Sequence, residues 1–161
     1  MVKVLVKKLD PKVVIPSYKT KGASGMDLMA FVKEKILIKP QTSALIPTGL
    51  SVSFSEDYEI QIRPRSGLAA KNNISVLNTP GTIDSDYRGE LKIIIFNHSK
   101  HDFVVNNNDR VAQMVLIPIA KMELEEANEL PKTLRGEGGF GSTGKWVKIW
   151  IKARLRDSQD K

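Results

Sequence analysis

A polar segment near the middle of the chain places an acid, a tyrosine and an arginine within five residues of one another. Asp84, Tyr87 and Arg88 lie in the segment Asp84–Glu90, directly before an apolar run. A carboxylate can act as a general base when it lies within hydrogen-bond reach of the group that loses its proton. From composition alone, a solvated hairpin explains the segment equally well.

Three other segments carry groups that bind anions. Arg63–Gly67 combines two arginines, a serine and a glycine, and Arg110 and Gln113 flank the start of another apolar run. The segment Thr133–Gly144 is rich in glycine and contains one aromatic residue, Phe140. Glycine at that density does not hold a fixed conformation alone, and its backbone N–H groups can wrap phosphate oxygens. We therefore predict anion binding, one candidate general base, and a mobile arm that becomes ordered on a ligand.

Two glycine patterns and the histidines do not predict a further site. Gly136–Gly141 matches G-x-G-x-x-G, but it follows no expected strand and opens no expected helix. Gly139–Lys145 resembles a P-loop, but Trp146 occupies the position where Ser or Thr must hold magnesium. His98 and His101 have no evident third nitrogen or sulfur ligand beside them, so we predict no zinc site.

The elements that must position these groups are mostly short strands. Apolar residues at every second position, typical of half-buried strands, appear in Val2–Val6, Ile36–Ile38 and Ile60–Ile62. Leu91–Phe96 and Val111–Ile119 are almost continuously apolar, which predicts strands covered on both faces. Many short strands with frequent turn residues favour a sandwich, barrel or jelly roll.

Two short segments predict helices, Ser66–Lys71 and Met122–Leu130. The chain of 161 residues suits one domain, and it contains no cysteine. The missing cysteines exclude a disulfide framework, thiolate zinc sites and cysteine nucleophiles. The first ten residues do not resemble a signal peptide, and no apolar run is long enough to cross a bilayer. We therefore predict a cytoplasmic protein without membrane contact.

The basic residues are unevenly distributed along the chain. The formal net charge of +7 favours polyanions, either nucleic acid or a phosphate ester. Residues 145–161 contain six basic and two acidic side chains, a net charge of +4. The rest of the chain is closer to neutral, so we expect no obligatory nucleic-acid partner. The terminal segment is expected to be disordered or locally packed, or alternatively to add a strand or touch a membrane surface or nucleic acid.

Taken together and in order, five segments resemble the five motifs of the trimeric dUTPase family. The match runs from about Ile15 to Gly144. One motif alone is weak, whereas five in the right order at family-like spacing are specific. The five segments are Gly22–Leu28, Arg63–Leu68, Asn78–Gly89, Asp109–Met114 and Arg135–Gly144.

The resemblance implies an all-β, jelly-roll-like β-barrel subunit in a homotrimer whose active sites are shared between chains. Residues 1–132 would form the β domain and residues 133–144 a glycine-rich arm that closes a neighbouring active site. Residues 145–161 would be a basic extension beyond the usual end of the family. The implied enzyme hydrolyses dUTP to dUMP and pyrophosphate, which limits uracil incorporation into DNA and supplies dUMP for dTMP synthesis.

The resemblance also implies roles for residues of the third motif. Asp84 is the implied general base, which deprotonates a water that attacks the α-phosphorus. Tyr87 would lie under the deoxyribose, where a 2′-hydroxyl would collide with the ring. Asn78 would help to reject cytosine in the hairpin that receives uracil. The other implied binding positions in this region are Gly81, Thr82, Ile83 and Lys92.

The remaining implied residues contact the triphosphate and its metal. Ser66 would donate to the oxygen between the α- and β-phosphorus, and Gln113 would hold an α-phosphate oxygen. Phe140 would stack over uracil when the arm closes. Mg²⁺ would bridge the phosphates, with Asp27 as its anchor through water, or Asp27 would only shape the trimer interior. The other implied phosphate contacts are Arg65, Gly67, Arg135, Gly141, Ser142 and Thr143.

Two alternative functions remain open at this point. A dCTP deaminase of the same superfamily would keep the fold and release ammonia. A non-enzymatic, basic β-domain that binds nucleic acid would show a steep dependence of binding on salt. The low aromatic content, 6%, argues against a stacking platform for single strands.

Overall fold

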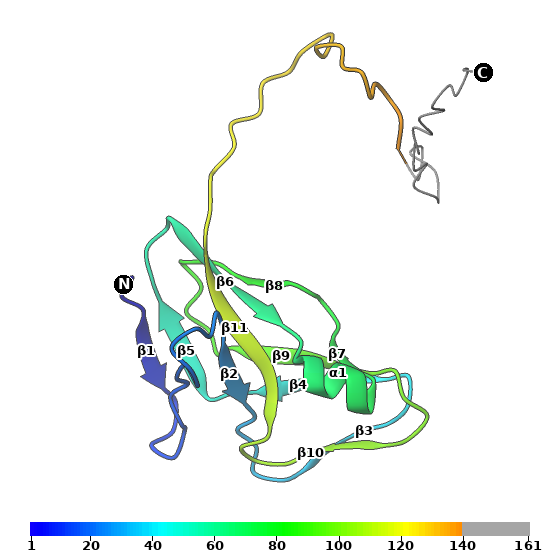
Figure 1. Cartoon of the computed structure of the whole chain (residues 1–161). Helices are drawn as coiled ribbons and strands as arrows, with labels where there is room; N and C mark the ends of the chain where they lie inside the picture. Colours follow the sequence, from blue (N-terminus) through cyan, green and yellow to red (C-terminus); the bar gives the residue numbers. More distant parts are fainter. Residues whose placement is uncertain (140–161) are drawn as a thin grey trace, which may run out of the picture. The chain divides into compact units, whose positions relative to one another are not determined.

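The computed structural model describes residues 1–139, and its first unit is built almost entirely from β-strands (Figure 1). Contacts divide the chain into two compact units, Met1–Lys121 and Met122–Lys161. The described part of the second unit, residues 122–139, contains no helix or strand. The first unit contains helix α1, Ser66–Asn72, and the strands β1 Leu5–Lys8, β2 Met26–Met29, β3 Ile36–Ile38, β4 Ser43–Pro47, β5 Leu50–Ser53, β6 Tyr58–Arg63, β7 Ile74–Val76, β8 Gly81–Ile83, β9 Lys92–Asn97, β10 Phe103–Val105 and β11 Arg110–Pro118.

Strand β11 lies at the centre of the largest sheet, which has the order β2-β11-β6-β8. A three-stranded sheet has the order β4-β9-β7, and β1 pairs with β5 and β3 with β10. All of these pairings are antiparallel, and most join strands that are distant in sequence. Such long-range antiparallel pairing is typical of jelly rolls. The predicted all-β fold is confirmed.

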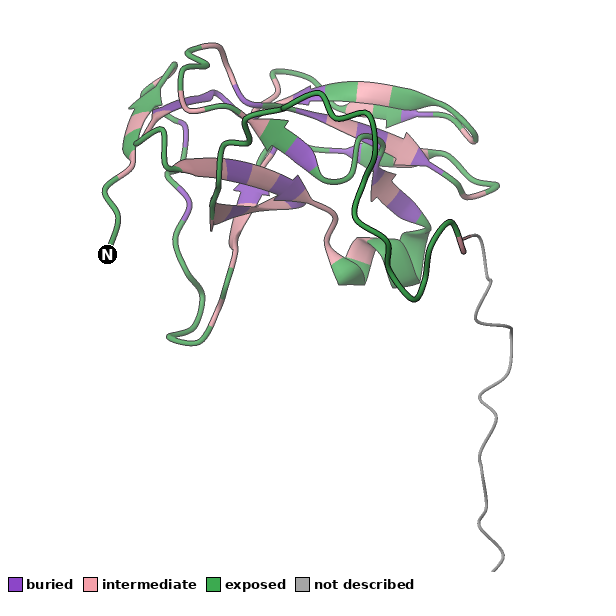
Figure 2. Cartoon of the chain, turned by 90° about the horizontal axis from the view of Figure 1, so that it is seen from above, coloured by how far each residue is buried: buried purple, intermediate pink, exposed green. Residues whose placement is uncertain are grey.

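One apolar core lies between the sheets, and the alternation along each strand determines which side chains enter it. On β6, Ile60 and Ile62 are buried while their neighbours are not. On β9, Ile93 and Ile95 are buried in the same way. Figure 2 shows buried positions alternating with partly exposed ones along the strands. Each such isoleucine stabilises the fold by roughly 1.5–3 kcal/mol, so the alternation fixes the strand faces.

Helix α1 confirms one of the two predicted helices and presents the second motif. Arg65 occupies its N-cap position, where no side chain caps the helix. Asn73 ends the helix in the left-handed conformation, φ 54°, and its N–H bonds the carbonyls of Ala69 and Leu68. Left-handed asparagine is a common helix terminator. The turn from β6 into α1 therefore exposes Ser66 at the first helical position.

Two expectations about these elements were wrong. Met122–Leu130 forms no helix, and Met122 and Leu124 are 82% and 86% exposed. Short helices gain most of their stability from packing an apolar face. Nothing in the described part of this unit covers the apolar side chains of this segment. Strand β9 is not covered on both faces within one chain, because Ile94 and Phe96 are only half-buried.

The first predicted strand begins three residues later than expected, at Leu5 rather than Val2. Val2 is exposed, whereas Val4 and Val6 pack against the core. Among residues 1–139, no helix is long and apolar enough to span a membrane. The cytoplasmic location stays a prediction.

Candidate active site

Asp27 on β2 connects three of the motif segments. Its Oδ1 accepts a hydrogen bond from Arg65 Nε at 2.8 Å, and its Oδ2 accepts one from Arg110 Nη1 at 3.3 Å. Arg65 Nη1 also donates to the Arg110 carbonyl at 3.2 Å. Gln113 Nε2 donates to the Pro64 carbonyl at 3.0 Å. The first, second and fourth motifs therefore meet at one end of the β2-β11-β6 sheet.

The register of β11 explains why these residues meet. Gln113 lies opposite Asp27 on one side and Arg63 on the other. A register shift between Arg110 and Ala112 pairs Arg110 with Met29. Side chains alternate between faces along a strand, so without this bulge Arg110 would point away from the Asp27 face. The bulge brings Arg110 onto the same face as Asp27, in agreement with the common use of bulges to redirect side chains at functional sites.

A groove of about 370 Å³ lies beside the two arginines. Two guanidinium groups share the Asp27 carboxylate and Asp109 also lines the groove, so these charges balance, while the remaining N–H groups of the arginines can still bind an anion. A Cβ added to Gly67 meets no atom of the chain within 4 Å, so the space beside the start of α1 is open. The groove is lined by Arg65, Leu68, Phe103, Val104, Asn108, Asp109, Arg110 and Val111.

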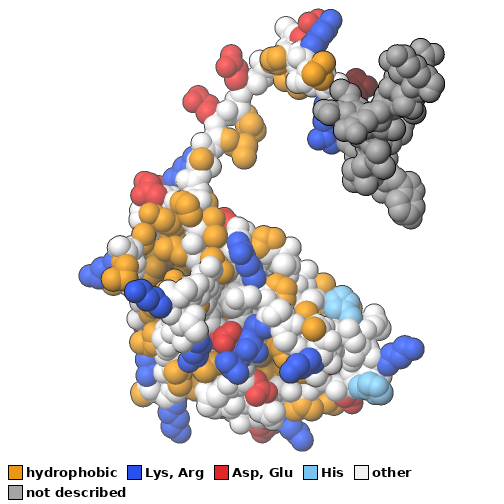
Figure 3. Space-filling view, in the orientation of Figure 1, with side chains coloured by type: hydrophobic (Ala, Val, Ile, Leu, Met, Phe, Trp, Pro, Cys, Tyr) orange, Lys and Arg blue, Asp and Glu red, His pale blue; other side chains and the backbone are white. Residues whose placement is uncertain are grey.

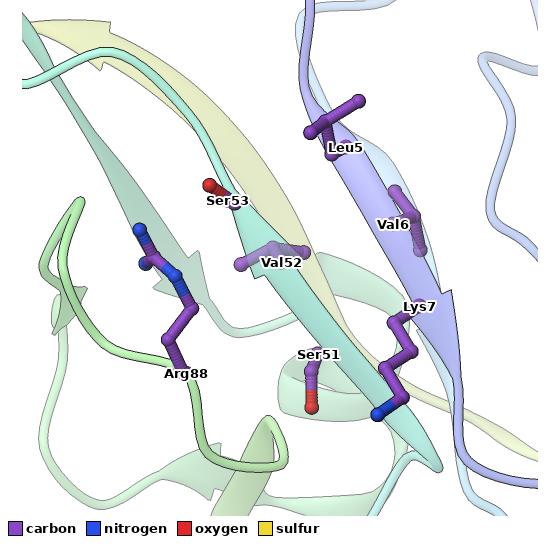
Figure 4. A pocket seen from close by; sticks show the side chains of 7 residues that line it. All are labelled: Leu5, Val6, Lys7, Ser51, Val52, Ser53 and Arg88. Carbon is purple, nitrogen blue, oxygen red and sulfur yellow. The ribbon is translucent and has the colours of Figure 1, made fainter.

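A second hollow, of about 290 Å³, lies against the paired strands β1 and β5 and contains none of the predicted site residues (Figure 4). Its walls are the strand segments Leu5–Lys7 and Ser51–Ser53, with Arg88 at one side. On the face shown in Figure 3, blue Lys and Arg side chains are scattered rather than gathered in one patch. That visible face does not have the continuous basic surface expected of a nucleic-acid binder.

The third motif forms a tight turn after β8. Strand β8 pairs with β6, and the Tyr87 N–H donates to the Asp84 carbonyl at 3.2 Å. Tyr87 Oη donates to the Glu90 carbonyl at 3.1 Å, which holds the phenol across Gly89. A Cβ at Gly89 would lie 2.2 Å from Tyr87 Oη, so only glycine fits beneath this ring position. Sequence reasoning missed the role of Gly89, although the Tyr-x-Gly spacing was visible.

Glycine also fits closely at the start of the uracil hairpin predicted from the sequence. A Cβ at Gly81 would lie 3.2 Å from Asn78 Nδ2 and 3.4 Å from the Asn78 carbonyl. Gly81 is buried, whereas Thr82 is exposed and Ile83 is half-buried. The peptide bond between Thr79 and Pro80 is cis. The backbone and amide of Asn78 therefore lie directly against the first residue of β8.

Asp84 and Arg65 do not meet within one chain. Ile83 lies opposite Ile60 near the start of β6, whereas Arg65 follows the other end of that strand. The five steps along the chain from Ile60 to Arg65 cover roughly 17 Å of extended backbone. The candidate base and the candidate phosphate-binding arginine therefore lie near opposite ends of β6 in a single subunit.

Lys92 and Arg135 occupy more peripheral places. Lys92 Nζ lies 3.6 Å from Glu90 Oε2, and Glu90 Oε1 accepts the Gly49 N–H at 2.8 Å. Arg135 Nε donates to the Gly138 carbonyl at 2.7 Å within a local turn of the second unit. The predicted residues Phe140, Gly141, Ser142 and Thr143 lie outside the described residues, as does the segment 145–161.

The fold and the site together define a class: an all-β protein with an arginine-lined groove at one sheet edge and a glycine-dependent hairpin beside a carboxylate. Comparison with known proteins narrows this class. A family model described as dUTPase matches residues 11–144. The deoxyuridine 5′-triphosphate nucleotidohydrolase of Nautilia profundicola is 52% identical over 143 residues, 89% of this chain and 99% of the relative. The Fusobacterium nucleatum protein of the same name is 52% identical over 146 residues, 87% of this chain and 100% of the relative.

Solved structures agree with this assignment. The dUTPase of Staphylococcus bacteriophage 80alpha with dUPNHPP has a TM-score of 0.80 and 28% identity, and the match covers 88% of this chain and 98% of the phage chain. A mutant dUTPase of phage phi11 of S. aureus, described with a structural Mg(II) ion, has a TM-score of 0.73 and 26% identity, with 81% of this chain and 99% of that chain covered.

The chain belongs to the dUTPase family. It is a hydrolase that acts on dUTP, which confirms the family and the activity predicted from the sequence motifs. The match favours dUTP hydrolysis over both alternatives, deamination of dCTP and non-enzymatic binding of nucleic acid.

Proposed function

We propose that this enzyme works as a homotrimer whose active sites combine residues of different subunits. The separation of Asp84 from Arg65 along β6 is the observation that carries the proposal. The base must lie within hydrogen-bond reach of the attacking water, and the groups that bind the leaving pyrophosphate must contact atoms only a few bonds away on the same substrate. Both sets of enzyme groups must therefore lie close together. In one chain the backbone positions that carry these groups lie roughly 17 Å apart along β6. If a second subunit supplies the hairpin with its Asp84, that carboxylate can lie close to Arg65 of the first subunit.

An exposed apolar row supports the same arrangement. Leu45 lies opposite Ile94 on β9, and the Leu77 N–H donates to the Ile94 carbonyl at 2.8 Å. The three side chains share the outer face of the β4-β9-β7 sheet, where Leu45 and Leu77 are each 53% exposed. Contiguous apolar residues on an outer sheet face favour a protein contact. A second copy that covers this row would bury β9 on both faces, as its sequence predicts.

The proposed reaction is attack of water on the α-phosphorus of dUTP, with pyrophosphate as the leaving group. Asp84 orients the water and takes its proton. Ser66 donates a hydrogen bond to the oxygen between the α- and β-phosphorus, where charge grows as the bond breaks. Gln113, which donates to the Pro64 carbonyl, and Arg65, which donates to Asp27, hold the phosphate chain on the other subunit.

The proposed selectivity comes from the hairpin. Tyr87 is held by Glu90 over Gly89, and its ring occupies the space of a ribose 2′-hydroxyl. Uracil enters beside Asn78 and the β8 backbone of Gly81, Thr82 and Ile83, where Asn78 discriminates against cytosine.

Magnesium is proposed to arrive with the triphosphate. Among residues 1–139, no group of three or more His, Cys, Asp or Glu side chains forms a cage for a metal ion. Mg²⁺ commonly binds substrate phosphates and one carboxylate while it keeps several waters. Asp27 lies beside Arg65 and fits this mode through water, because both of its oxygens already accept hydrogen bonds. The ion would neutralise charge on the phosphates.

The C-terminal residues are proposed to complete the site. Residues 133–144 act as the arm of one subunit on the active site of another, where Phe140 covers uracil. Arg135, with Gly141, Ser142 and Thr143, binds the γ-phosphate. Within the described residues, Arg135 Nε donates to the Gly138 carbonyl. Residues 145–161 are proposed to form a basic extension beyond this arm.

Subunit mixing tests the shared site. Asp84→Asn and Arg65→Ala are each expected to inactivate a homotrimer. Co-expression with different tags yields mixed trimers, in which some interfaces combine an intact Asp84 with an intact Arg65. Random mixing of two inactive subunits should restore about a quarter of wild-type activity, since one in four neighbour pairs supplies both residues in the right order. Mixed trimers that stay inactive would contradict the shared site.

A further inference from the structure

We infer that Asp27 is a positioning residue, which holds Arg65 and Arg110 ready for the triphosphate whether or not magnesium is bound. The inference deepens the proposed function and rests on it, because it concerns the phosphate side of the same site. If Asp27 only contacted the metal through water, or only packed inside the trimer, it would not need to hold the two arginines.

The hydrogen bonds around Asp27 form a closed arrangement. Each carboxylate oxygen accepts from a different arginine, Arg65 Nε at 2.8 Å and Arg110 Nη1 at 3.3 Å. The two arginines are also joined directly, because Arg65 Nη1 donates to the Arg110 carbonyl at 3.2 Å. The Arg65 guanidinium is therefore fixed at two of its nitrogens. A guanidinium has five N–H groups, so three of them remain for other acceptors.

Burial and charge support a positioning role. The Asp27 side chain is 19% exposed and that of Arg65 23%, whereas Arg110 is 52% exposed. Like charges repel, and the carboxylate between the two guanidinium groups lets them lie near each other. Both arginines also border the open groove beside α1. Arginine side chains fixed before binding lose less conformational freedom when the phosphates arrive.

The bulge in β11 contributes to the positioning of Arg110 beside Asp27. It turns Arg110 onto the Asp27 face, where the alternation of the strand would otherwise point it away. Asp27 itself is fixed by the pairing of β2 with β11 opposite Gln113. Asp27 and Arg110 are thus positioned from strands, and Arg65 from the two-residue link between β6 and α1, which favours a preformed phosphate site.

The experiment measures binding of dUPNHPP, and of inorganic triphosphate, once with magnesium and once with EDTA. Asp27→Asn keeps the shape of the side chain but points an NH₂ donor at one of the two guanidinium groups. We expect it to weaken binding about tenfold in both conditions, the effect of losing one charge-assisted hydrogen bond. The control is Glu56→Gln, which removes a carboxylate from the exposed ion pair with Lys121 and should leave binding unchanged.

A defect that appears only with magnesium and vanishes in EDTA would overturn the inference, because Asp27 would then act through the metal alone. A second measurement uses Arg65→Gln and the double variant. If Asp27 acts through Arg65, Asp27→Asn should add little further loss to Arg65→Gln, and fully multiplicative losses would contradict it. Thermal unfolding checks that each variant is folded. Inorganic triphosphate distinguishes a failure of the proposed function from a failure of this inference. If the wild type does not hydrolyse dUTP but its binding of triphosphate still depends on Asp27, only the proposed function is wrong.

Discussion

Gly89 controls the position of Tyr87, and this makes the choice between deoxyribose and ribose testable without touching the tyrosine. In Gly89→Ala the new Cβ would lie 2.2 Å from Tyr87 Oη and 2.4 Å from Cζ. Tyr87 is 44% exposed, so its ring can swing outward instead of straining the backbone. The swing breaks the 3.1 Å bond to the Glu90 carbonyl, which costs about 1 kcal/mol. Stability should therefore fall only slightly.

The displaced ring should no longer exclude the 2′-hydroxyl. Steric overlap of this kind is worth roughly 1–3 kcal/mol, so the ratio of kcat/KM for dUTP to that for UTP should fall about tenfold or more. The assay is pyrophosphate release from each nucleotide. Gly22→Ala is the matched control, since its Cβ meets nothing within 4 Å. Tyr87→Phe keeps the ring and should keep most of the discrimination. An unchanged ratio in a folded Gly89→Ala protein would refute the proposed role of the ring.

Two further substitutions test the framework that carries the site. In Gly49→Ala, a residue at φ +68° gains a Cβ only 2.4 Å from Val13 Cγ2, which should destabilise the fold by more than about 1 kcal/mol in denaturant unfolding. In Asn97→Ala, the fully buried amide loses its bonds to the carbonyls of Ile38 at 2.9 Å and His101 at 2.8 Å. The unpaired carbonyls should lower the free energy of unfolding by roughly 2–4 kcal/mol.

Matched substitutions at exposed positions control for the change of residue type alone. Gly22→Ala introduces the same methyl group into open space, and Asn72→Ala removes an exposed amide at the end of α1. Both should change unfolding by less than about 0.5 kcal/mol. If Gly49→Ala or Asn97→Ala behaved like its control, the packing around β4, β5 and β9 described above would be wrong.

Patterns along the chain predicted the strands well because alternation is a local signal. The alternation around Ile60 placed β6, the apolar run Leu91–Phe96 placed β9, and the short helical segment Ser66–Lys71 placed α1. The helix predicted at Met122–Leu130 was wrong, because a short apolar-acidic pattern does not reveal whether another surface will cover its apolar side chains. A helix there would need such a partner.

The candidate site was predictable as a set of residues but not as an arrangement. The motifs identified Asp27, Arg65 and Gln113, yet their meeting depends on the register of β11 between β2 and β6. The bulge that redirects Arg110 is invisible in the sequence, because nothing local marks the extra residue. The distance from Asp84 to Arg65 likewise follows from the pairing of β8 with β6.

The most direct test of the central claim is pyrophosphate release from dUTP by the wild type and by Asp84→Asn. We expect the wild type to hydrolyse dUTP in preference to dTTP, dCTP and UTP, and to lose this activity when EDTA removes magnesium. Asp84→Asn should still bind dUPNHPP while hydrolysis falls at least about a hundredfold, the usual contribution of a general base. Hydrolysis at the wild-type rate in Asp84→Asn would contradict the assignment of the base and, with it, the proposed mechanism.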